Sequence, residues 1–368
     1  MRVVVCGSGV IGAATAYFLS RRGADVTVIE RASVACASSG KAGAFLALDW
    51  CAGSPLDALA RRSFALHAQL ADELDDDWGY QPVTTYGGYS VSGQDTRRRA
   101  GRDWLSDRVA VTGQLGSTET TAMVHPRLFT EALIRAAQAH GATLQIGQVT
   151  GVVRDSSGTV ARGVAVQYDD ETSVVEADAV VIAMGPWSVL AADWLPFPDI
   201  HAYKGHSVIY ETGASVPPEA LFLEYQTPTG AVVTPEFFPR ADGTTYVAYS
   251  ATQDRLPLDP ADVQPDPHSI TQLELLCEQV SPVLARTAIL TRQACYRPVT
   301  DDGLPLIGKV PGVAGAYVGT GHSVWGVLNG PATGEALAEL IVDGAAQTTN
   351  LRAFDPARFR PRDPYQGR

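Results

Sequence analysis

The stretch RVVVCGSGVIGAATAYFLSRRGADVTVIER, residues 2–31, constrains the fold more than any other part of the chain. Val3 to Val5 form a β-branched run, which predicts a strand buried on both faces. Glycines follow at positions 7, 9 and 12, apolar residues then recur at helical spacing, and DVTVIE predicts a second strand. A strand, a glycine-rich turn, a helix and a strand that ends in an acid form one unit of a parallel sheet, so we predict an α/β fold.

The glycines and the acid of this unit each have a physical role in binding a dinucleotide. Gly7 permits a tight turn, Gly9 lets the backbone approach a pyrophosphate, and Gly12 lets the helix pack against the strand. The helix N-terminus offers unpaired N–H groups and the positive end of its dipole to phosphates. Glu30 stands about 20 residues on, where a carboxylate accepts ribose hydroxyls. The unit predicts a dinucleotide site and disfavours the 2′-phosphate of NADP, but it does not decide between NAD and FAD.

Composition excludes several classes of protein. The 368 residues suffice for one large or two intertwined domains, and 45% apolar with 18% charged residues is typical of a globular protein. A net charge of -12 argues against nucleic acid as the main partner. The five cysteines lack metal-ligand spacing, so we expect reduced thiols, no metal site and a cytoplasmic location.

The N-terminus leads directly into the first strand, so we expect no signal peptide. No apolar run approaches the ~20 residues that a membrane helix needs, so we expect no membrane partner.

Periodicity outlines the rest of the chain. Helical patterns cover 55–74, 126–140 and 333–344, and residues 179–185 predict a buried strand. Residues 86–93, 204–212 and 244–252 alternate apolar and polar side chains, as strands of an antiparallel sheet do. We predict a discontinuous domain with a parallel sheet over 1–75, 120–198 and 296–368, and a second α+β domain with a mostly antiparallel sheet over 76–119 and 199–295.

Five blocks, in order, resemble the D-amino-acid oxidase, glycine oxidase and sarcosine oxidase (DAO) family of FAD-dependent oxidoreductases. They are the first glycine motif with ASSGKAGAF after it, HPRLFTEALIRAAQAHGATLQIGQVTGV, ADAVVIAMGPWS, RPVTDDGLPLIGKVPG, and YVGTGHSVWGVLNGPATGEALAELIVDG. The resemblance implies a Rossmann-like FAD-binding domain whose flavin is roofed by the antiparallel sheet of the second domain.

The resemblance also implies which residues contact FAD. They are Gly7, Gly9, Val10, Ile11, Gly12, Glu30, Arg31, Ser38, Ser39, Lys41, Ala42, Gly43, Ala44, Val149, Ala183, Gly185, Trp187, Gly321, His322, Ser323, Val324, Trp325, Gly326 and Val327.

Some sarcosine oxidases attach FAD through a cysteine near the place of Cys295. Cys295 stands one residue out of that register, and a shift of one residue in an extended segment turns a side chain away. We therefore expect non-covalent FAD.

Three residues are the catalytic candidates. Arg297 resembles the family's carboxylate clamp, and a guanidinium fork matches a carboxylate with two parallel bonds; the alternative is a surface pair with Asp301 or Asp302. The resemblance places Glu236 at a strand position that a tyrosine occupies in glycine oxidases. Glu236 either holds the substrate amine or faces outward. His322 begins the turn that approaches the flavin, or it is a structural histidine.

Lys41 leaves two alternatives open. Its side chain either lies beside the reactive edge of the flavin, or it contacts phosphate or solvent.

The resemblance implies an enzyme that oxidises the C–N bond of a small amino acid or N-substituted glycine-like amine. Hydride transfer to flavin N5 would give an imine, and O2 would reoxidise the flavin to give H2O2. Two alternatives stay open: a dehydrogenase that passes electrons to a protein or quinone, and a degenerate flavoprotein that acts as a binding or assembly factor. The sequence leaves the oligomeric state open, a homo-oligomer included.

Overall fold

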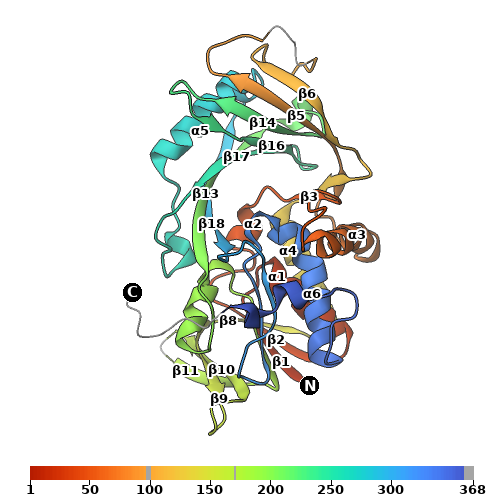
Figure 1. Cartoon of the computed structure of the whole chain (residues 1–368), viewed down its shortest axis with the longest axis vertical. Helices are drawn as coiled ribbons and strands as arrows, with labels where there is room; N and C mark the ends of the chain where they lie inside the picture. The colour runs from red at the N-terminus through yellow and green to blue at the C-terminus, as the bar shows by residue number, and fades with distance from the viewer. Residues whose placement is uncertain (97–100, 170, 360–368) are drawn as a thin grey trace.

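The computed structural model describes residues 1–96, 101–169 and 171–359, and within them the chain forms four β-sheets. A six-stranded sheet and its helices occupy the lower half of Figure 1, and an eight-stranded sheet lies above. The long strands β13 and β18 run down one side and join the two halves (Figure 1). This mixed architecture confirms the α/β fold with a parallel sheet and a second, mostly antiparallel sheet.

The six-stranded sheet carries the glycine motif. Its strands follow the order β19 (Leu306–Lys309), β20 (Ala316–Thr320), β12 (Ala179–Ile182), β1 (Arg2–Cys6), β2 (Asp25–Glu30) and β8 (Thr143–Ile146). All neighbours pair in parallel except β19 and β20. Val3, Val4 and Val5 are at most 1% exposed, because both faces of this sheet are covered.

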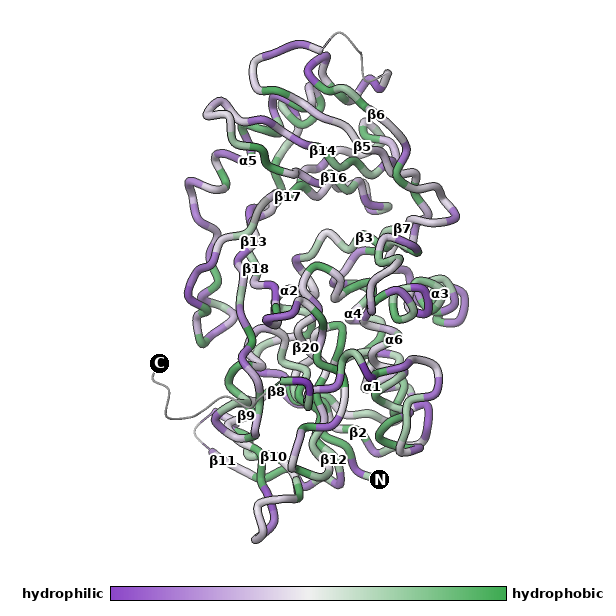
Figure 2. The backbone as a smooth tube through the Cα atoms, in the orientation of Figure 1, coloured by the Kyte–Doolittle hydropathy of each residue, from purple (hydrophilic) through white to green (hydrophobic). Residues whose placement is uncertain are grey.

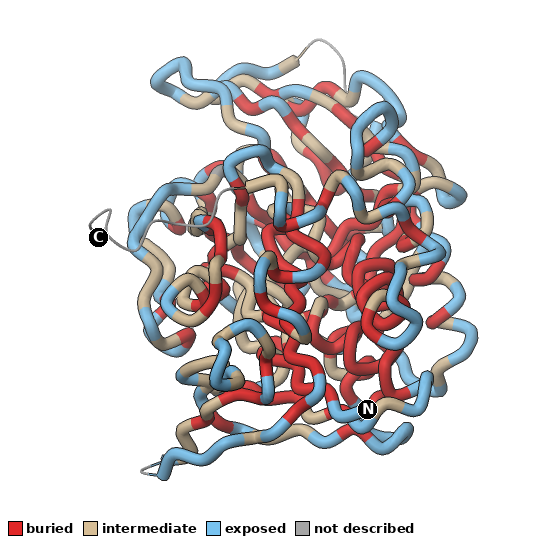
Figure 3. The backbone as a smooth tube through the Cα atoms, turned by 60° about the horizontal axis from the view of Figure 1, so that its bottom comes forward, coloured by how far each residue is buried: buried red, intermediate tan, exposed pale blue. Residues whose placement is uncertain are grey.

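Helices cover one face of this sheet and a small sheet covers the other. The helices are α1 (Val10–Arg21), α4 (Pro126–Ala139) and α6 (Gly326–Val342), and α3 (Asp57–Glu73) packs against α6. The small sheet contains β9 (Gln148–Arg154), β10 (Ala161–Tyr168) and β11 (Glu171–Glu176). Figure 2 shows hydrophobic residues concentrated where the sheet meets its helices, and Figure 3 shows the same interior as buried. The helices predicted over 55–74 and 126–140 are therefore confirmed to within two residues at each end.

The eight-stranded sheet forms the roof of the molecule. Its order is β18 (Ile289–Val299), β13 (His201–Glu211), β17 (Thr244–Thr252), β16 (Glu236–Pro239), β14 (Glu219–Gln226), β5 (Thr84–Val91) and β6 (Val109–Gly116), with β15 (Val232–Val233) paired to β14. Only β14 and β5 run parallel within the described pairs. The alternating segments 86–93, 204–212 and 244–252 are confirmed as strands of this sheet.

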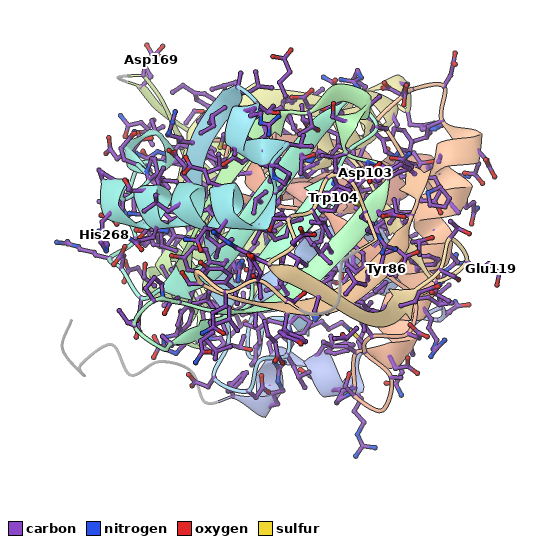
Figure 4. The ribbon with its side chains drawn as sticks, turned by 90° about the horizontal axis from the view of Figure 1, so that it is seen from above. Tyr86, Asp103, Trp104, Glu119, Asp169 and His268 are labelled. Atoms are coloured by element: carbon purple, nitrogen blue, oxygen red, sulfur yellow. The ribbon has the colours of Figure 1, made fainter. Side chains whose placement is uncertain are left out.

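The upper face of the roof is closed by α5 (Pro267–Val280) and by Trp104. Figure 4, a view from above, shows α5 and the segment with Asp103 and Trp104 lying over the roof strands. Trp104 is 2% exposed and its ring centroid lies 6.3 Å from that of Phe237. The lower face of the roof is thus left to face the six-stranded sheet.

Short elements complete the chain. Strands β3 (Phe45–Ala47), β7 (Thr121–Met123) and β4 (Gln81–Pro82) form the fourth sheet, and α2 spans Ser38–Lys41. Short 3-10 helices span Gly185–Asp193, Gly213–Ser215, Pro260–Asp262, Leu284–Arg286, Ser323–Trp325, Arg352–Phe354 and Pro356–Arg358. Among the described residues, no helix has the length and apolar character needed to span a membrane.

The division into two domains stays a prediction. Strand β18 (Ile289–Val299) belongs to the roof and crosses the expected boundary between residues 295 and 296. The last residues of the expected cofactor domain, 360–368, lie outside the described residues.

Helices α1 and α6 cross with their backbones in contact, and this contact generates a prediction. A Cβ added at Gly334 would lie 2.5 Å from the carbonyl carbon of Ala14, so Gly334→Val must push the helices apart. We expect the free energy of unfolding to fall by about 1–3 kcal/mol, measured as a lower urea midpoint.

Gly113→Val is the matched control, because nothing lies within 4 Å of a Cβ added there. Equal midpoints for the two variants would contradict the close crossing.

Candidate active site

The turn between β1 and α1 excludes side chains at two positions. Gly7 has φ +102°, and a Cβ added there would lie 2.6 Å from the carbonyl oxygen of Ala183. A Cβ added at Gly12 would lie 1.9 Å from the carbonyl oxygen of Gly7. The first turn of α1 therefore lies directly on the glycine loop, and β12 lies beside it.

Two helix N-termini open onto one pocket. Gly9 begins α1 and Trp325 begins α6, and neither supplies a side-chain cap to its helix. Val10 N–H donates to Ser39 Oγ at 2.9 Å, which brings the segment after β2 to the start of α1. The remaining N–H groups of the first turns and the positive ends of two helix dipoles make this pocket favourable for an anionic ligand.

Glu30 lies at the end of β2 and is held by backbone donors. Its Oε2 accepts from Ser8 N–H at 2.9 Å, and its Oε1 accepts from Ala32 N–H at 3.0 Å. Next to it, the Arg31 guanidinium donates to the Leu258 carbonyl at 2.8 Å and pairs with Asp259 at 3.2 Å. The acid is therefore fixed at the pocket wall, and the arginine ties that wall to residues 258–259.

Most residues predicted to contact a cofactor line this one pocket. Gly12, Lys41 and Gly321 do not line it. Those that do are Gly7, Gly9, Val10, Ile11, Glu30, Arg31, Ser38, Ser39, Ala42, Gly43, Ala44, Val149, Ala183, Gly185, Trp187, His322, Ser323, Val324, Trp325, Gly326 and Val327. The catalytic candidates Arg297 and Glu236 line the same pocket from the roof.

Arg297 reaches the pocket because of the alternation along β18. Gln293, Cys295 and Arg297 share one face of this strand. Gly205 is the partner of Cys295 on β13, and a Cβ added there would lie 3.5 Å from a terminal nitrogen of Arg297. The glycine thus leaves the surface beside the guanidinium open.

Among the described residues, the two acids that could pair with Arg297 at the surface form ion pairs with other side chains. Asp301 pairs with His201 at 2.6 Å, and Asp302 pairs with Arg358 at 2.8 Å.

Glu236 begins β16, opposite Phe222 on β14 and Ala248 on β17. It faces the pocket and not the solvent side of the roof. Burial raises the pKa of its carboxyl, and the positive charge of Arg297 opposes this rise. Within the described residues, neither the Glu236 carboxyl nor the Arg297 guanidinium forms a hydrogen bond or an ion pair within 4.0 Å, so the pocket presents one acidic and one cationic side chain without direct partners.

His322 is a neutral, buried side chain. It is 4% exposed, its Nε2 lies 3.0 Å from Thr333 Oγ1, and burial lowers its pKa to about 3. Its Nδ1 is buried with no partner among the described residues. The structure therefore offers a neutral ring nitrogen at the pocket wall and not an imidazolium.

Cys295 corrects an expectation. The register argument turns its side chain away from the cofactor, but the structure places Cys295 on the pocket wall. The reason is that Cys295 and Arg297 are two residues apart on β18 and so share a face. Burial raises the pKa of the Cys295 thiol, opposed by Arg297 and Lys41.

Lys41 ends α2 next to this part of the roof. Its backbone carbonyl accepts from Gln293 Nε2 at 3.1 Å, which joins α2 to β18. The Lys41 side chain is only partly buried, and its contact with a cofactor stays a prediction.

Arg240 clamps the segment after α2 onto the roof. Its guanidinium donates to the Ala42 carbonyl at 2.8 Å and lies 5.3 Å from the Tyr246 ring centroid. A Cβ added at Gly43 would lie 2.6 Å from the Phe238 ring. Residues 42–44 are therefore held against the roof and line the pocket.

Sequence reasoning missed the apolar part of the pocket. Its unpredicted wall residues include Phe45, Trp50, Phe222, Phe238 and Tyr246, besides Gly205. The five aromatic residues come from four strands and a loop. Only the place of three of them on alternate positions of β14, β16 and β17 gave a signal.

The geometry suits a dinucleotide cofactor on one side and a zwitterionic ligand on the other. The N-termini of α1 and α6, Glu30 and the glycine turn lie on the side of the six-stranded sheet, whereas Arg297 and Glu236 lie on the roof. In the part of the chain that the structure describes, no group of three or more His, Cys, Asp or Glu side chains is placed to hold a metal ion.

Comparisons with known proteins agree over nearly the whole chain. The family model for FAD-dependent oxidoreductases (DAO) matches residues 2–340. A putative oxidoreductase of Schizosaccharomyces pombe is 30% identical, covering 96% of this chain and 97% of that protein. A glycine oxidase of Pseudomonas aeruginosa is 27% identical, covering 98% of each.

Solved structures share the same fold. The crystal structure of glycine oxidase from Geobacillus kaustophilus has a TM-score of 0.80 at 23% identity, covering 97% of this chain and 99% of that one. With the family match over residues 2–340, the chain is an enzyme that belongs to the DAO family of FAD-dependent oxidoreductases.

Proposed function

We propose that this enzyme oxidises the C–N bond of an amino acid or N-substituted glycine-like amine to an imine, with non-covalently bound FAD, O2 as acceptor and H2O2 as product. The observation that carries the proposal is the pair Arg297 and Glu236, two opposite charges without direct partners on the same roof face. An amino acid carries the two complementary charges on neighbouring atoms.

FAD fits the lower side of the pocket. The N–H groups at the start of α1 would hold the pyrophosphate, Glu30 the ribose hydroxyls, and Val149 the adenine. The turn at residues 321–327 would hold the flavin, with the positive end of α6 directed at it. The bound flavin would supply the two-electron acceptor that the reaction needs.

The roof residues bind and orient the substrate. Arg297 binds the carboxylate through two parallel hydrogen bonds and so fixes the carbon that bears the amine. Glu236 holds the ammonium or accepts its proton, which leaves a neutral amine. Loss of a proton from nitrogen and of a hydride from carbon gives the imine, and water then converts the imine to a carbonyl compound and ammonia or an amine.

Burial supports non-covalent binding. Thiolate is the nucleophilic form of cysteine, and the raised pKa of Cys295 disfavours it. All five cysteines are free thiols, which suits the cytoplasmic location predicted from the sequence.

The first test is a visible absorption spectrum of the purified holoenzyme before and after anaerobic addition of amino acids and N-methylglycine. We expect flavin bands that bleach, and that return rapidly in air. Slow return in air would favour the dehydrogenase. Bands that never bleach would overturn an amino-acid substrate, and a protein that takes up no FAD would favour the binding-factor alternative.

Arg297→Ala tests the carboxylate contact. We expect KM for the amino acid to rise about 10²-fold while FAD stays bound, because a buried charge pair with the substrate is lost. Arg297→Lys should recover part of the affinity, since it keeps the charge but not the fork.

Arg292→Ala on the same strand is the control, because Arg292 is 50% exposed and pairs with Glu274 outside the pocket. Unchanged kinetics in Arg297→Ala would refute the carboxylate contact.

Glu236→Gln tests the amine contact through pH. Because burial raises the pKa of Glu236, we expect kcat/KM to rise with pH through a step above the ordinary glutamate pKa of about 4.3. The step should vanish in Glu236→Gln and persist in Glu224→Gln, which changes an exposed glutamate on β14. The same step in all three proteins would assign it to another group.

Stability supplies a second readout for Glu236. A carboxyl whose pKa rises on folding contributes stability that is present below about pH 4.3 and is lost as the pH rises through the folded-state pKa. As the pH rises over this window, the unmodified enzyme should therefore lose stability relative to Glu236→Gln, measured as the difference between their free energies of unfolding.

A further inference from the structure

Five aromatic rings form one end of the pocket, here called the aromatic wall: Phe45, Trp50, Phe222, Phe238 and Tyr246. Phe45 stacks on Phe238 with ring centroids 5.3 Å apart and 9° between the planes. Phe238 stacks on Tyr246 at 6.0 Å, and Trp50 meets Phe222 at 4.9 Å. The rings form one connected cluster that spans the roof and the segment around β3.

The register of the roof places this wall beside Glu236. Phe222 is the partner of Glu236 on β14, and Phe238 follows Glu236 by two residues on the same face of β16. Tyr246 is the partner of Phe238 on β17. Arg297 lies on β18, on the opposite side of β13 and β17. Phe222 therefore lies on the side of Glu236 away from Arg297, Phe238 shares the strand of Glu236, and Tyr246 lies on β17 between the strands of Glu236 and Arg297.

The five rings differ in how far they are buried. Phe45, Phe238 and Tyr246 are 9%, 3% and 5% exposed, because each is enclosed by its neighbours. Trp50 and Phe222 are only partly buried and both line the pocket. Packing between the roof and the segment around β3 explains why Phe45, Phe238 and Tyr246 are buried. Trp50 and Phe222 keep ring surface that this packing does not cover.

The free apolar surface of Trp50 and Phe222 is available to the substituent of a bound substrate. A substrate fixed by its carboxylate at Arg297 and by its amine at Glu236 must direct its remaining substituent along the roof or back toward solvent. Aromatic rings bury a large apolar area and contact other rings favourably. A glycine or N-methylglycine molecule would leave most of this surface against water.

We propose that the substrate carries a large apolar group, the size of a phenylalanine or leucine side chain, on the carbon that bears the amine, and that Phe222 and Trp50 bind this group. The inference rests on the proposed function and narrows its substrate class. It also departs from the small amino acid that the family resemblance implies, because the roof of this chain supplies the wall.

The test is anaerobic reduction of the holoenzyme by glycine, N-methylglycine, alanine, leucine and phenylalanine, with both enantiomers of each chiral amino acid. We expect the second-order rate constant of flavin reduction to be at least about tenfold higher for one enantiomer of phenylalanine and of leucine than for alanine or glycine.

Two variants locate the effect. Phe222→Ala should lower the ratio of the rate constants for phenylalanine and alanine about tenfold, and Phe222→Leu should lower it less, because it keeps apolar bulk. Tyr89→Ala is the control, since Tyr89 lies on β5 of the same sheet, is 43% exposed and does not line the pocket. Its ratio should not change.

The outcomes separate the inference from the function on which it rests. Faster reduction by glycine would overturn the inference and leave the proposed function standing. Preference for N-methylglycine over every primary amine would also overturn it, because the rings would then recognise an alkylated ammonium by cation–π contact. No reduction by any of the compounds would overturn both.

Discussion

The site depends on the antiparallel pairing of β13 with β18, two strands of 11 residues each. The pairing runs from His201 and Val299 at one end to Tyr210 and Ile289 at the other, and it connects the roof to the six-stranded sheet. Val299 then bridges to His322, in the turn before α6. Arg297 is only two residues from that bridge, so the side chain proposed to bind the substrate is fixed close to the turn that would hold the flavin.

The roof also places two ionisable side chains, Arg297 on β18 and Glu236 on β16, at one pocket. Glu236 and Arg297 are partly buried, and removing charges from water without close partners costs free energy. The pair has opposite signs and faces one pocket, so a zwitterionic ligand can complete two ion pairs that the protein leaves open. His322 adds no charge, because burial lowers its pKa to about 3. Perturbed groups in a pocket mark it as the place of function.

The limits of prediction from the sequence follow from how local each feature is. The glycine turn, α1 and Glu30 lie within about 30 residues, and their pattern alone predicts the parallel sheet. Arg297 and Glu236 came from the resemblance, since a lone arginine or glutamate in a strand says little. Cys295 was misplaced because its facing was argued from another protein's register, although its spacing of two from Arg297 already implied a shared face.

The aromatic wall could not be predicted, because its rings come together through non-local pairing. Phe222 meets Glu236 only because β14 inserts between β16 and a parallel partner, β5, that lies far earlier in the chain. In the proposed function, backbone amides and glycines hold the cofactor, whereas side chains on separate strands hold the substrate. A substitution on β14 or in the loop after β3 can therefore change the preferred side chain while the glycine turn and the Arg297 contact stay as they are, which is why a strong family motif says little about the substrate.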